Sequence, residues 1–282
     1  MHCHGQSTTQ PPAPQRSATW VAVVPVKPLR AAKTRLRGAV PEAVHPDLVL
    51  AMARDTVAAA LACRAVARVV VVCDDPAVCA ELTALGAVCL PDAPAAGLNA
   101  ALSYGAQAAQ HAVGERSTFN GHPADSPPRA DARSDRADTA ASSANDPQAH
   151  RPEAARADAR PDHGAQRPGT ERVGVVALTA DLPAMRPCDL ESALVAAART
   201  GRRAFVPDLE GTGTVLLAAP AGEPLAPHFG PGSAAAHLRS GAVRLDGAWP
   251  SLRRDVDTAA DLDAAARLGL GTHTGQVLCA VA

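Results

Sequence analysis

The sequence predicts an α/β fold, a three-layer sandwich in which helices cover both faces of a mainly parallel sheet. Short apolar runs rich in Val, such as WVAVVPV at 20–26 and VARVVVVC at 66–73, are typical of strands that are buried on both faces. Longer stretches with apolar residues at helical spacing alternate with these runs, and this alternation is typical of parallel βα units.

Each element of the first half has a reason in the sequence. The first strand ends near Pro25, because proline lacks the N–H that a sheet ladder needs. Leu48, Met52 and Val57 fall at roughly helical spacing, with Ala between them, and favour a helix. In order, we expect a strand at 20–26, a basic loop at 27–36, a helix at 47–63, a strand at 66–73, a short helix at 77–85, a strand at 87–90 and a helix at 99–112.

The composition then changes, because Phe119 is the only large apolar side chain between Gly114 and Arg172. Such a segment cannot bury enough apolar surface to offset the entropy of ordering it. We therefore expect a disordered insertion at 113–171 within one folded domain, made of 18–112 and 172–282, that follows a disordered tail at 1–17. A partner-binding role for the insertion is the alternative.

After the insertion, VGVVALTADLP at 173–183 predicts a central buried strand that ends close to Asp181. Asp189 and Thr258 are expected to cap the two longer helices that follow. The expected elements are a helix at 189–200, strands at 204–206 and 215–219, a helix at 234–240, a strand at 242–245, a strand end at 252–257 and a helix at 259–268.

Composition excludes several classes of function. The chain has 27 Lys and Arg against 28 Asp and Glu, a net charge of -1, which argues against binding nucleic acid or anionic membranes through bulk positive charge. Its seven Cys form no CxxC pair, which favours a reducing compartment without disulfides or a zinc site. No apolar run approaches the roughly 18 residues of a membrane span, and we expect a cytoplasmic protein.

Acidic side chains follow several of the expected strands, namely Asp74, Asp75, Asp181, Asp255 and Asp257. The carboxyl ends of parallel strands meet at one edge of a sheet, where open α/β sheets bind ligands. Mg²⁺ prefers a couple of carboxylates together with phosphate oxygens. The sequence thus indicates a metal site, and a set of helix or turn caps is the alternative.

Basic residues follow the first strand, with Lys27, Arg30, Lys33 and Arg35 inside nine residues. Lys and Arg beside open backbone N–H groups suit a nucleotide triphosphate, and a solvated surface loop is the alternative. Neither the P-loop pattern GxxxxGK[ST] nor the dinucleotide pattern GxGxxG occurs.

Two Gly-rich segments, at 212–214 and 229–233, place small hydroxyls beside open N–H groups, as carboxylate and phosphate sites do, although turn chemistry explains either one alone. Asn99, two residues after Gly97, is either a helix cap or a reader of a base or ribose. No GxSxG or HExxH motif occurs, so phosphate chemistry with a divalent metal is the remaining class.

Several motifs stand in one order along the chain: VVPVKPLRAAKTRL, VVVCDD, GLNAAL, ALTADLPAM, GTGTVLL, HFGPGSAAAHLRSGA and LRRDVDTAADLDAA. In this order they resemble the guanylyltransferases of deazaflavin coenzyme F-420 biosynthesis, which act on phosphoenolpyruvate or 2-phospho-L-lactate. The resemblance covers about residues 19–270 except the insertion. It implies a nucleotide-diphosphosugar-transferase-like sandwich, a single nucleotidyltransferase domain around the insertion.

The resemblance also implies the reaction and its catalytic residues. GMP would pass from GTP to phosphoenolpyruvate, giving enolpyruvoyl-diphospho-5'-guanosine and pyrophosphate. Mg²⁺ is the implied cofactor, with Asp181 and Asp255 as ligands and Asp257 as a further one. Asp181, Asp255 and Lys33 are the implied catalytic residues.

The remaining implied roles concern the two substrates. Thr214, Gly230 and Ser233 would bind the carboxylate and phosphate of the phosphorylated acid. For GTP, the implied set is Lys27, Lys33 and Arg35 at the phosphates and the segment from Gly97 to Asn99 at the guanosine.

Alternatives to this interpretation differ in substrate or in class. One alternative is the same reaction on 2-phospho-L-lactate or 3-phosphoglycerate. Phosphoenolpyruvate is preferred only because the Ala-, Arg-, Gly- and Pro-rich composition suggests a GC-rich, actinobacterial-type source. A nucleotidyltransferase for sugar phosphates or the molybdopterin cofactor is another, although those usually carry a GxGxR loop, and PVKPLRAAKTRL stands here instead. A nucleotide-binding scaffold is the non-enzyme alternative, and a homodimer is plausible.

Overall fold

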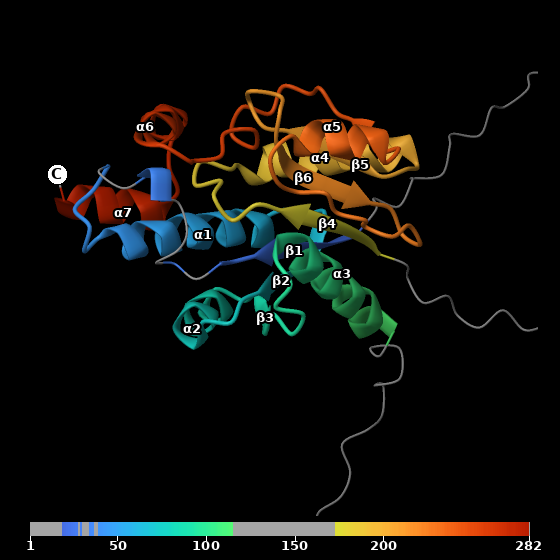
Figure 1. Ribbon diagram of the computed structural model, residues 1–282, viewed down its shortest axis with the longest axis horizontal. Coiled ribbons are helices and arrows are strands. Elements are labelled where there is room, and N and C mark those ends of the chain that lie inside the picture. Colours follow the sequence, from blue (N-terminus) through green and yellow to red (C-terminus); the bar gives the residue numbers. More distant parts are fainter. Residues whose placement is uncertain (1–18, 28, 30–33, 37–38, 115–172, 282) are drawn as a thin grey trace, which may run out of the picture. The chain divides into compact units, whose positions relative to one another are not determined.

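The computed structural model describes residues 19–27, 29, 34–36, 39–114 and 173–281. Within them, seven strands form one sheet in the order β3-β2-β1-β4-β6-β5-β7 (Figure 1). The strands are β1 (Trp20–Pro25), β2 (Val66–Val72), β3 (Val88–Leu90), β4 (Gly174–Leu178), β5 (Ala204–Pro207), β6 (Thr214–Ala219) and β7 (Val243–Arg244). The helices are α1 (His45–Leu61), α2 (Pro76–Ala84), α3 (Leu98–Gly114), α4 (Pro187–Thr200), α5 (Ser233–Arg239), α6 (Ala259–Leu268) and α7 (Thr272–Val281), with a 3₁₀ turn at Thr34–Leu36.

The sheet is mainly parallel, as predicted. Strands β3, β2, β1 and β4 run parallel to one another, and β5 is parallel to β7. Only β6 runs antiparallel, to both β4 and β5. Its reversed direction brings the start of β6, at Thr214, to the edge where β4 and β5 end.

Strand β4 joins the two halves of the chain. It pairs with β1 in register, with Val21 opposite Val175 and Val23 opposite Ala177. The segments on either side of the predicted insertion therefore share one sheet. The predicted tail at 1–17 and the insertion at 113–171 lie outside the described residues, except that 113–114 end α3.

Helices pack on both faces of the sheet (Figure 1). On one face, α1, α2 and α4 share an apolar core with Ala22 and Val24 of β1. On the other face, α3 and α5 share a core with Val21 and Val23. Successive residues of one strand point to opposite faces, so β1 contributes to both cores and needs an apolar residue at every position. The predicted α/β sandwich is confirmed.

Three local predictions were wrong. Residues 252–257 are irregular rather than a strand end. Helix α4 begins at Pro187 with Arg186 as N-cap, and the Asp189 carboxylate accepts instead from the Ser251 hydroxyl at 2.6 Å. Helix α7 was not predicted. Thr258 does cap α6, through a capping box with Asp261.

Helix α7 depends on a distant residue. The Asp55 carboxylate of α1 accepts from the backbone N–H groups of His273 and Thr274, at 3.0 and 2.8 Å, and satisfies the first turn of α7. None of the described helices has the length and apolarity that crossing a lipid bilayer requires.

At position 174, the packing of the Trp20 side chain leaves room only for glycine. A Cβ at this position would lie 2.5 Å from Cε3 and 2.6 Å from Cζ3 of Trp20, whose side chain is 1% exposed. Gly174→Ala should lower the free energy of unfolding by about 1–3 kcal/mol in urea titrations, because the buried indole has no room to move. Gly275→Ala in α7, where a Cβ meets nothing within 4 Å, is the control and should be neutral or stabilising by up to about 1 kcal/mol. Equal losses in the two variants would contradict this assignment.

Candidate active site

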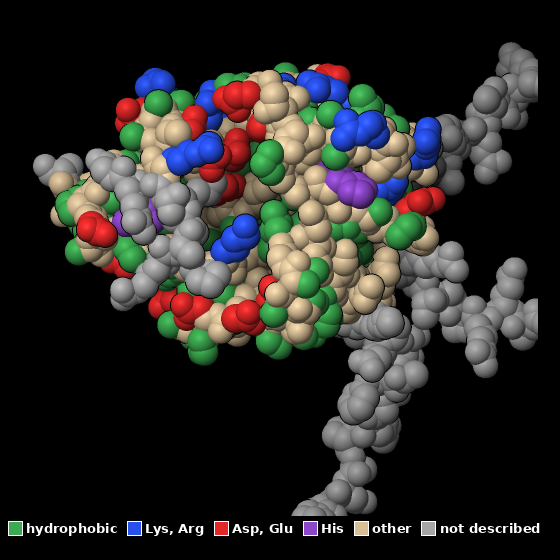
Figure 2. Space-filling view, in the orientation of Figure 1, with side chains coloured by type: hydrophobic (Ala, Val, Ile, Leu, Met, Phe, Trp, Pro, Cys, Tyr) green, Lys and Arg blue, Asp and Glu red, His purple; other side chains and the backbone are tan. Residues whose placement is uncertain are grey.

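A pocket of about 680 Å³ lies where β1, β4 and β5 end and β6 begins. Its wall combines cationic, anionic and hydroxyl groups with a Gly-rich loop. Lining it are Pro25–Lys27, Arg35, Val49, Met52, Ala53, Leu98, Thr179–Asp181, Asp208, Thr212–Thr214, Phe229–Ser233, Asp255 and Asp257. On the surface, acidic side chains gather beside a hollow with a basic side chain across it (Figure 2).

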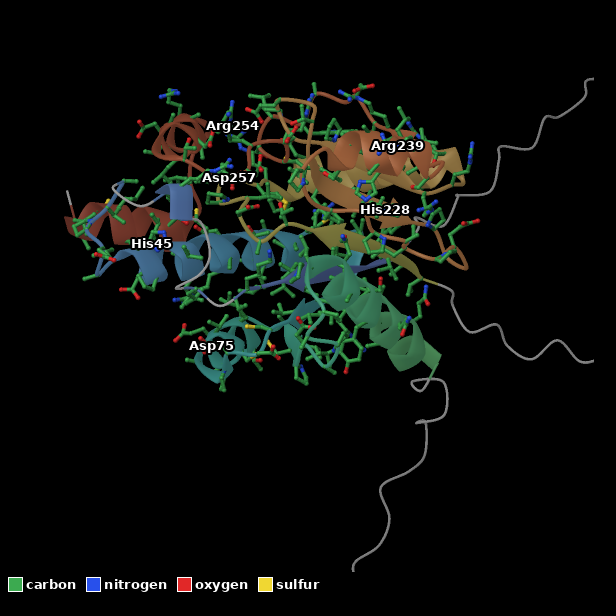
Figure 3. The ribbon with its side chains drawn as sticks, in the orientation of Figure 1. His45, Asp75, His228, Arg239, Arg254 and Asp257 are labelled. Carbon is green, nitrogen blue, oxygen red and sulfur yellow. The ribbon has the colours of Figure 1, made fainter. Side chains whose placement is uncertain are left out.

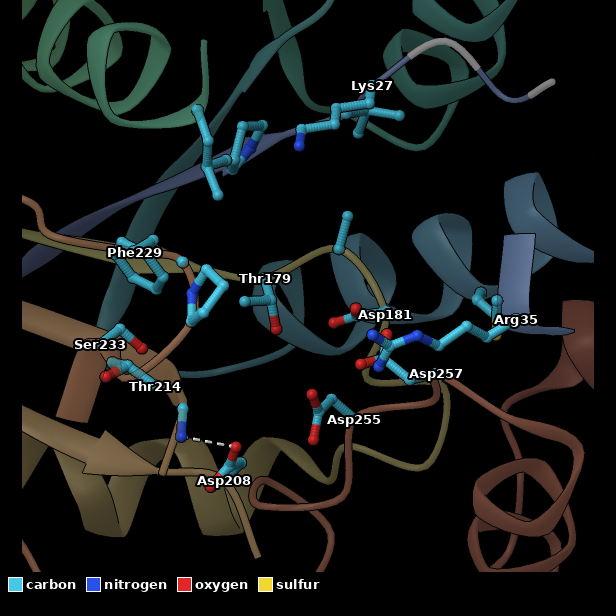
Figure 4. A pocket seen from close by; sticks show the side chains of 18 of the residues that line it. Lys27, Arg35, Thr179, Asp181, Asp208, Thr214, Phe229, Ser233, Asp255 and Asp257 are labelled. Atoms are coloured by element: carbon cyan, nitrogen blue, oxygen red, sulfur yellow. Dashed lines mark hydrogen bonds between the residues drawn. The ribbon is translucent and has the colours of Figure 1, made fainter. Parts of the chain in front are cut away.

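A backbone hydrogen bond brings three predicted carboxylates together. The Val256 N–H donates to the Asp181 carbonyl at 3.0 Å, which places the segment 252–257 beside the chain leaving β4. Val256 itself is fully buried, whereas Asp255 and Asp257 on either side of it line the pocket. Figure 4 shows the carboxylates of Asp181, Asp255 and Asp257 on one wall of the pocket.

Further contacts fix both partners of this hydrogen bond. The Arg253 guanidinium donates to the carbonyls of Pro207 and Asp208, at 3.2 and 2.9 Å, and ties the segment to the end of β5. The Thr56 hydroxyl of α1 accepts from the Leu182 N–H at 3.0 Å and holds the residue after Asp181. Side chains that bond to the backbone therefore hold the segments that carry these carboxylates.

Asp208 organises the loop before Thr214. Its carboxylate accepts from the N–H groups of Thr212 and Gly213, at 2.9 and 2.7 Å (Figure 4). A Cβ at Gly213 would collide with this carboxylate, so glycine is required there. The loop brings Thr214 into the pocket wall beside Ser233, and both side chains are buried. The sequence analysis missed Asp208.

Asn99 holds the Gly-rich loop in place. Its side-chain oxygen accepts from the Phe229 N–H at 2.7 Å, and its amide donates to the Phe229 carbonyl at 3.0 Å. This two-way contact joins α3 to the residues before Gly230 and Gly232, whose φ angles of 134° and 70° favour glycine. Asn99 and Gly97 do not line the pocket, whereas Leu98 between them does.

The basic residues lie opposite and beside the acids. Figure 4 shows Lys27 across the pocket from the carboxylates and Arg35 reaching toward them. Both are exposed, as a role in binding an anion requires. Lys33 and Arg30 lie outside the described residues.

Two of the strand-end acids lie elsewhere. Asp75 caps α2, accepting from the N–H groups of Ala77 and Val78 (Figure 3). Asp74 accepts from the Asp92 N–H at 2.7 Å. Neither lines the pocket, so the expectation that all the strand-end acids could gather at one site was wrong for this pair.

His237, which the sequence analysis did not single out, lies directly behind the pocket wall. Its side chain is fully buried, with Nδ1 3.0 Å from the Thr214 hydroxyl and Nε2 accepting from the His228 N–H at 2.9 Å. Burial, with smaller contributions from the charges of His228 and Arg203, lowers the pKa of His237 to about 4. The ring is therefore neutral at pH 7.

The pocket offers oxygen ligands for a hard cation. Among the described residues, no cluster of three or more His, Cys, Asp or Glu stands at metal-binding spacing. Mg²⁺ typically takes only one or two carboxylates plus phosphate oxygens and water, so Asp181 and Asp255 fit a site that substrate phosphates complete.

The contact between Asn99 and Phe229 generates a stability prediction. Asn99→Ala should cost about 1–3 kcal/mol of unfolding free energy and speed hydrogen exchange at the Phe229 amide, because two partly buried hydrogen bonds are lost. Ser103→Ala is the control, since the Ser103 hydroxyl donates only to the Asn99 carbonyl within α3. It should leave exchange at Phe229 unchanged. Unaltered exchange in Asn99→Ala would show that the loop is held by other contacts.

Known proteins with similar sequences share one description. A protein from Salinispora arenicola described as phosphoenolpyruvate guanylyltransferase is 47% identical over 93% of this chain and 94% of its own. Proteins with the same description from Geodermatophilus obscurus and Streptomyces scabiei are 43% and 45% identical over 92% and 90% of this chain, each over 94% of its own length. No protein-family model matches the chain.

A solved structure from Desulfovibrio desulfuricans G20, described as a nucleotide-diphospho-sugar transferase, has a TM-score of 0.50 and 14% identity, covering 93% of this chain and 94% of that one. At this identity the likeness concerns the fold, and it agrees with the predicted nucleotide-diphosphosugar-transferase-like sandwich. The similarity in sequence extends over nearly the whole length of the relatives. The chain therefore belongs to the phosphoenolpyruvate guanylyltransferase family.

Proposed function

We propose that the protein transfers GMP from GTP to phosphoenolpyruvate, forming enolpyruvoyl-diphospho-5'-guanosine and pyrophosphate, in coenzyme F-420 biosynthesis. The observation that carries the proposal is the 47% identity to a phosphoenolpyruvate guanylyltransferase over 93% of the chain. The pocket supports it, since carboxylates, two cationic side chains and a hydroxyl-bearing Gly-rich loop face one space.

The chain's own residues divide between the two substrates. Lys27 and Arg35 attract the GTP phosphates, together with Lys33, which lies outside the described residues. Thr214 and Ser233, with the open backbone at Gly230, hold the phosphate and carboxylate of phosphoenolpyruvate. The segment from Gly97 to Asn99 stays a prediction for the guanosine, with Leu98 as the part that reaches the pocket.

The proposed reaction is an in-line displacement. An oxygen of the phosphoenolpyruvate phosphate forms a bond to the α-phosphorus of GTP, and the bond from that phosphorus to the β-phosphate oxygen breaks. Pyrophosphate leaves with the electron pair, and Lys27 and Arg35 stabilise its charge. No covalent intermediate on the protein is needed, so the chain supplies positioning and charge neutralisation.

Mg²⁺ is the proposed cofactor, held by Asp181 and Asp255 with Asp257 beside them. When bound, it would supply positive charge that neutralises the phosphate oxygens of both substrates. Asp181, Asp255 and Lys33 are the proposed catalytic residues.

A cytoplasmic location is also proposed. The six described cysteines are all free, which supports a reducing compartment. Burial raises the pKa of the Cys63 and Cys73 thiols, so neither is a reactive thiolate. A homodimer stays a prediction.

The choice of acid is tested by product analysis. With GTP and Mg²⁺, phosphoenolpyruvate should give a GMP adduct by mass spectrometry and one pyrophosphate per adduct. Under the same conditions, 2-phospho-L-lactate and 3-phosphoglycerate should react at least about tenfold more slowly, since a tenfold ratio needs only about 1.4 kcal/mol of discrimination. Faster turnover of 2-phospho-L-lactate would reassign the substrate. Absence of pyrophosphate with all three acids would reject the guanylyltransferase.

Asp181 is tested by removing its charge. Asp181→Asn should lower kcat by about 100-fold or more, because the cation loses a carboxylate ligand, while the circular dichroism spectrum and the unfolding midpoint stay close to those of the parent. Asp74→Asn is the matched control, a strand-end acid outside the pocket, and should keep full activity. Near-full activity of Asp181→Asn would refute the metal assignment.

A further inference from the structure

His237 is a buried titratable residue to which the proposed reaction gives no role. It lies on α5 behind Thr214, and its ring is enclosed by two aromatic rings, with centroids 5.7 Å away for Phe205 and 5.2 Å away for Phe229. The ring has hydrogen bonds at both nitrogens. Those two hydrogen bonds determine both the position of the ring and which of its nitrogens carries the proton.

The contact with His228 determines which nitrogen carries the proton. A backbone N–H can only donate, so the His228 N–H at 2.9 Å requires a lone pair on Nε2 of His237. A neutral imidazole carries one proton, and that proton must then be on Nδ1. Neutrality follows from the burial among aromatic rings and agrees with the lowered pKa. The charged and titratable groups facing the ring, His228 and Arg203, oppose a positive charge on it.

The tautomer in turn determines the role of the Thr214 hydroxyl. Nδ1–H donates to Oγ1 of Thr214 at 3.0 Å, so that oxygen acts as the acceptor in this pair. The hydroxyl proton of Thr214 is then directed elsewhere. Among the described residues, the Thr214 hydroxyl has its hydrogen bond with His237, and Thr214 lines the pocket. Figure 4 shows Thr214 beside Ser233 on this wall.

We propose that His237 is a positioning residue that turns the Thr214 hydroxyl into a fixed hydrogen-bond donor for an anionic oxygen of the phosphorylated acid. The inference rests on the proposed function for the identity of that acid. A Thr hydroxyl carries one proton and two lone pairs. Nδ1–H occupies one of those lone pairs and cannot accept the hydroxyl proton, so that proton is available to a carboxylate or phosphate oxygen in the pocket.

If His237 has this role, losing the Thr214 hydroxyl should weaken the binding of phosphoenolpyruvate. Removing a hydrogen bond to a charged group typically costs a factor of about 10 to 100 in affinity. Thr214→Val keeps the shape of the side chain and removes the hydroxyl. It should raise KM for phosphoenolpyruvate by about 10- to 100-fold and leave KM for GTP within about twofold.

Two conservative variants separate the two hydrogen bonds of His237. In His237→Asn, the amide nitrogen is attached to Cγ, as Nδ1 is, and can still donate to Thr214. In His237→Gln, the amide lies one bond further out, where it can accept from the His228 N–H but no longer reaches Thr214. Each variant loses one buried hydrogen bond, so their unfolding free energies should be similar.

The kinetic results of these variants should nevertheless differ. His237→Gln should raise KM for phosphoenolpyruvate by about tenfold, with kcat and KM for GTP little changed, and His237→Asn should restore KM to within about threefold of the parent. In the Thr214→Val background, His237→Gln should raise KM for phosphoenolpyruvate by less than about twofold, because the hydroxyl that His237 positions is already absent. Equal effects of Asn and Gln, or full additivity in the double variant, would overturn the inference.

The tautomer is tested directly without substrate. In ¹⁵N-labelled protein at pH 7, long-range proton–nitrogen spectra should show a protonated Nδ1 and an unprotonated Nε2 for His237. The His237 signals are identified because they disappear in His237→Gln. An Nε2–H tautomer, or a doubly protonated ring, would overturn the inference whatever the activity. If the parent protein forms no adduct from GTP and any of the three acids, the proposed function fails while the tautomer result stands on its own.

Discussion

The hydrogen bond from the Val256 N–H to the Asp181 carbonyl determines how the rest of the site is built. Two segments that are 75 residues apart (256 minus 181) meet there, and their carboxylates face the same pocket. Like charges at close range repel each other unless a cation compensates them. Arg253 and Thr56 hold the two backbones in place, so contacts outside the pocket help to set the positions of these carboxylates.

The opposite wall follows a different design, in which hydrogen bonds from outside the pocket orient neutral groups inside it. Asp208 shapes the loop that carries Thr214, Asn99 fixes the loop that carries Gly230, and His237 holds the Thr214 hydroxyl. The antiparallel direction of β6 makes this possible, because it brings Thr214 to the carboxyl edge of the parallel strands. One sheet edge thus has an acidic wall suited to a cation and a hydroxyl-bearing wall suited to an anion.

Most of the regular elements could be predicted from local sequence, and part of the pocket lining could be predicted from the family resemblance. The Val-rich runs at β1, β2 and β4 have no other stable location than a doubly covered sheet, and the motifs placed Asp181, Asp255, Thr214 and Ser233 in one site. Features that depend on distant partners could not be predicted. Helix α7 begins where Asp55 supplies its cap, Asp189 bonds Ser251 instead of its own helix, and Asn99 holds Phe229. No local pattern marks such partners, nor His237 as the neighbour of Thr214.

The central claim is that Asp181 and Asp255 hold a divalent cation between the two substrates. Crystals grown with Mn²⁺ in place of Mg²⁺, a non-hydrolysable GTP analogue and phosphoenolpyruvate test it most directly through anomalous scattering. The account predicts a manganese peak within about 2.0–2.4 Å of carboxylate oxygens from both Asp181 and Asp255, close to the octahedral distances of hard cations. A manganese peak that contacts neither carboxylate, with both substrates bound in the pocket, would contradict it.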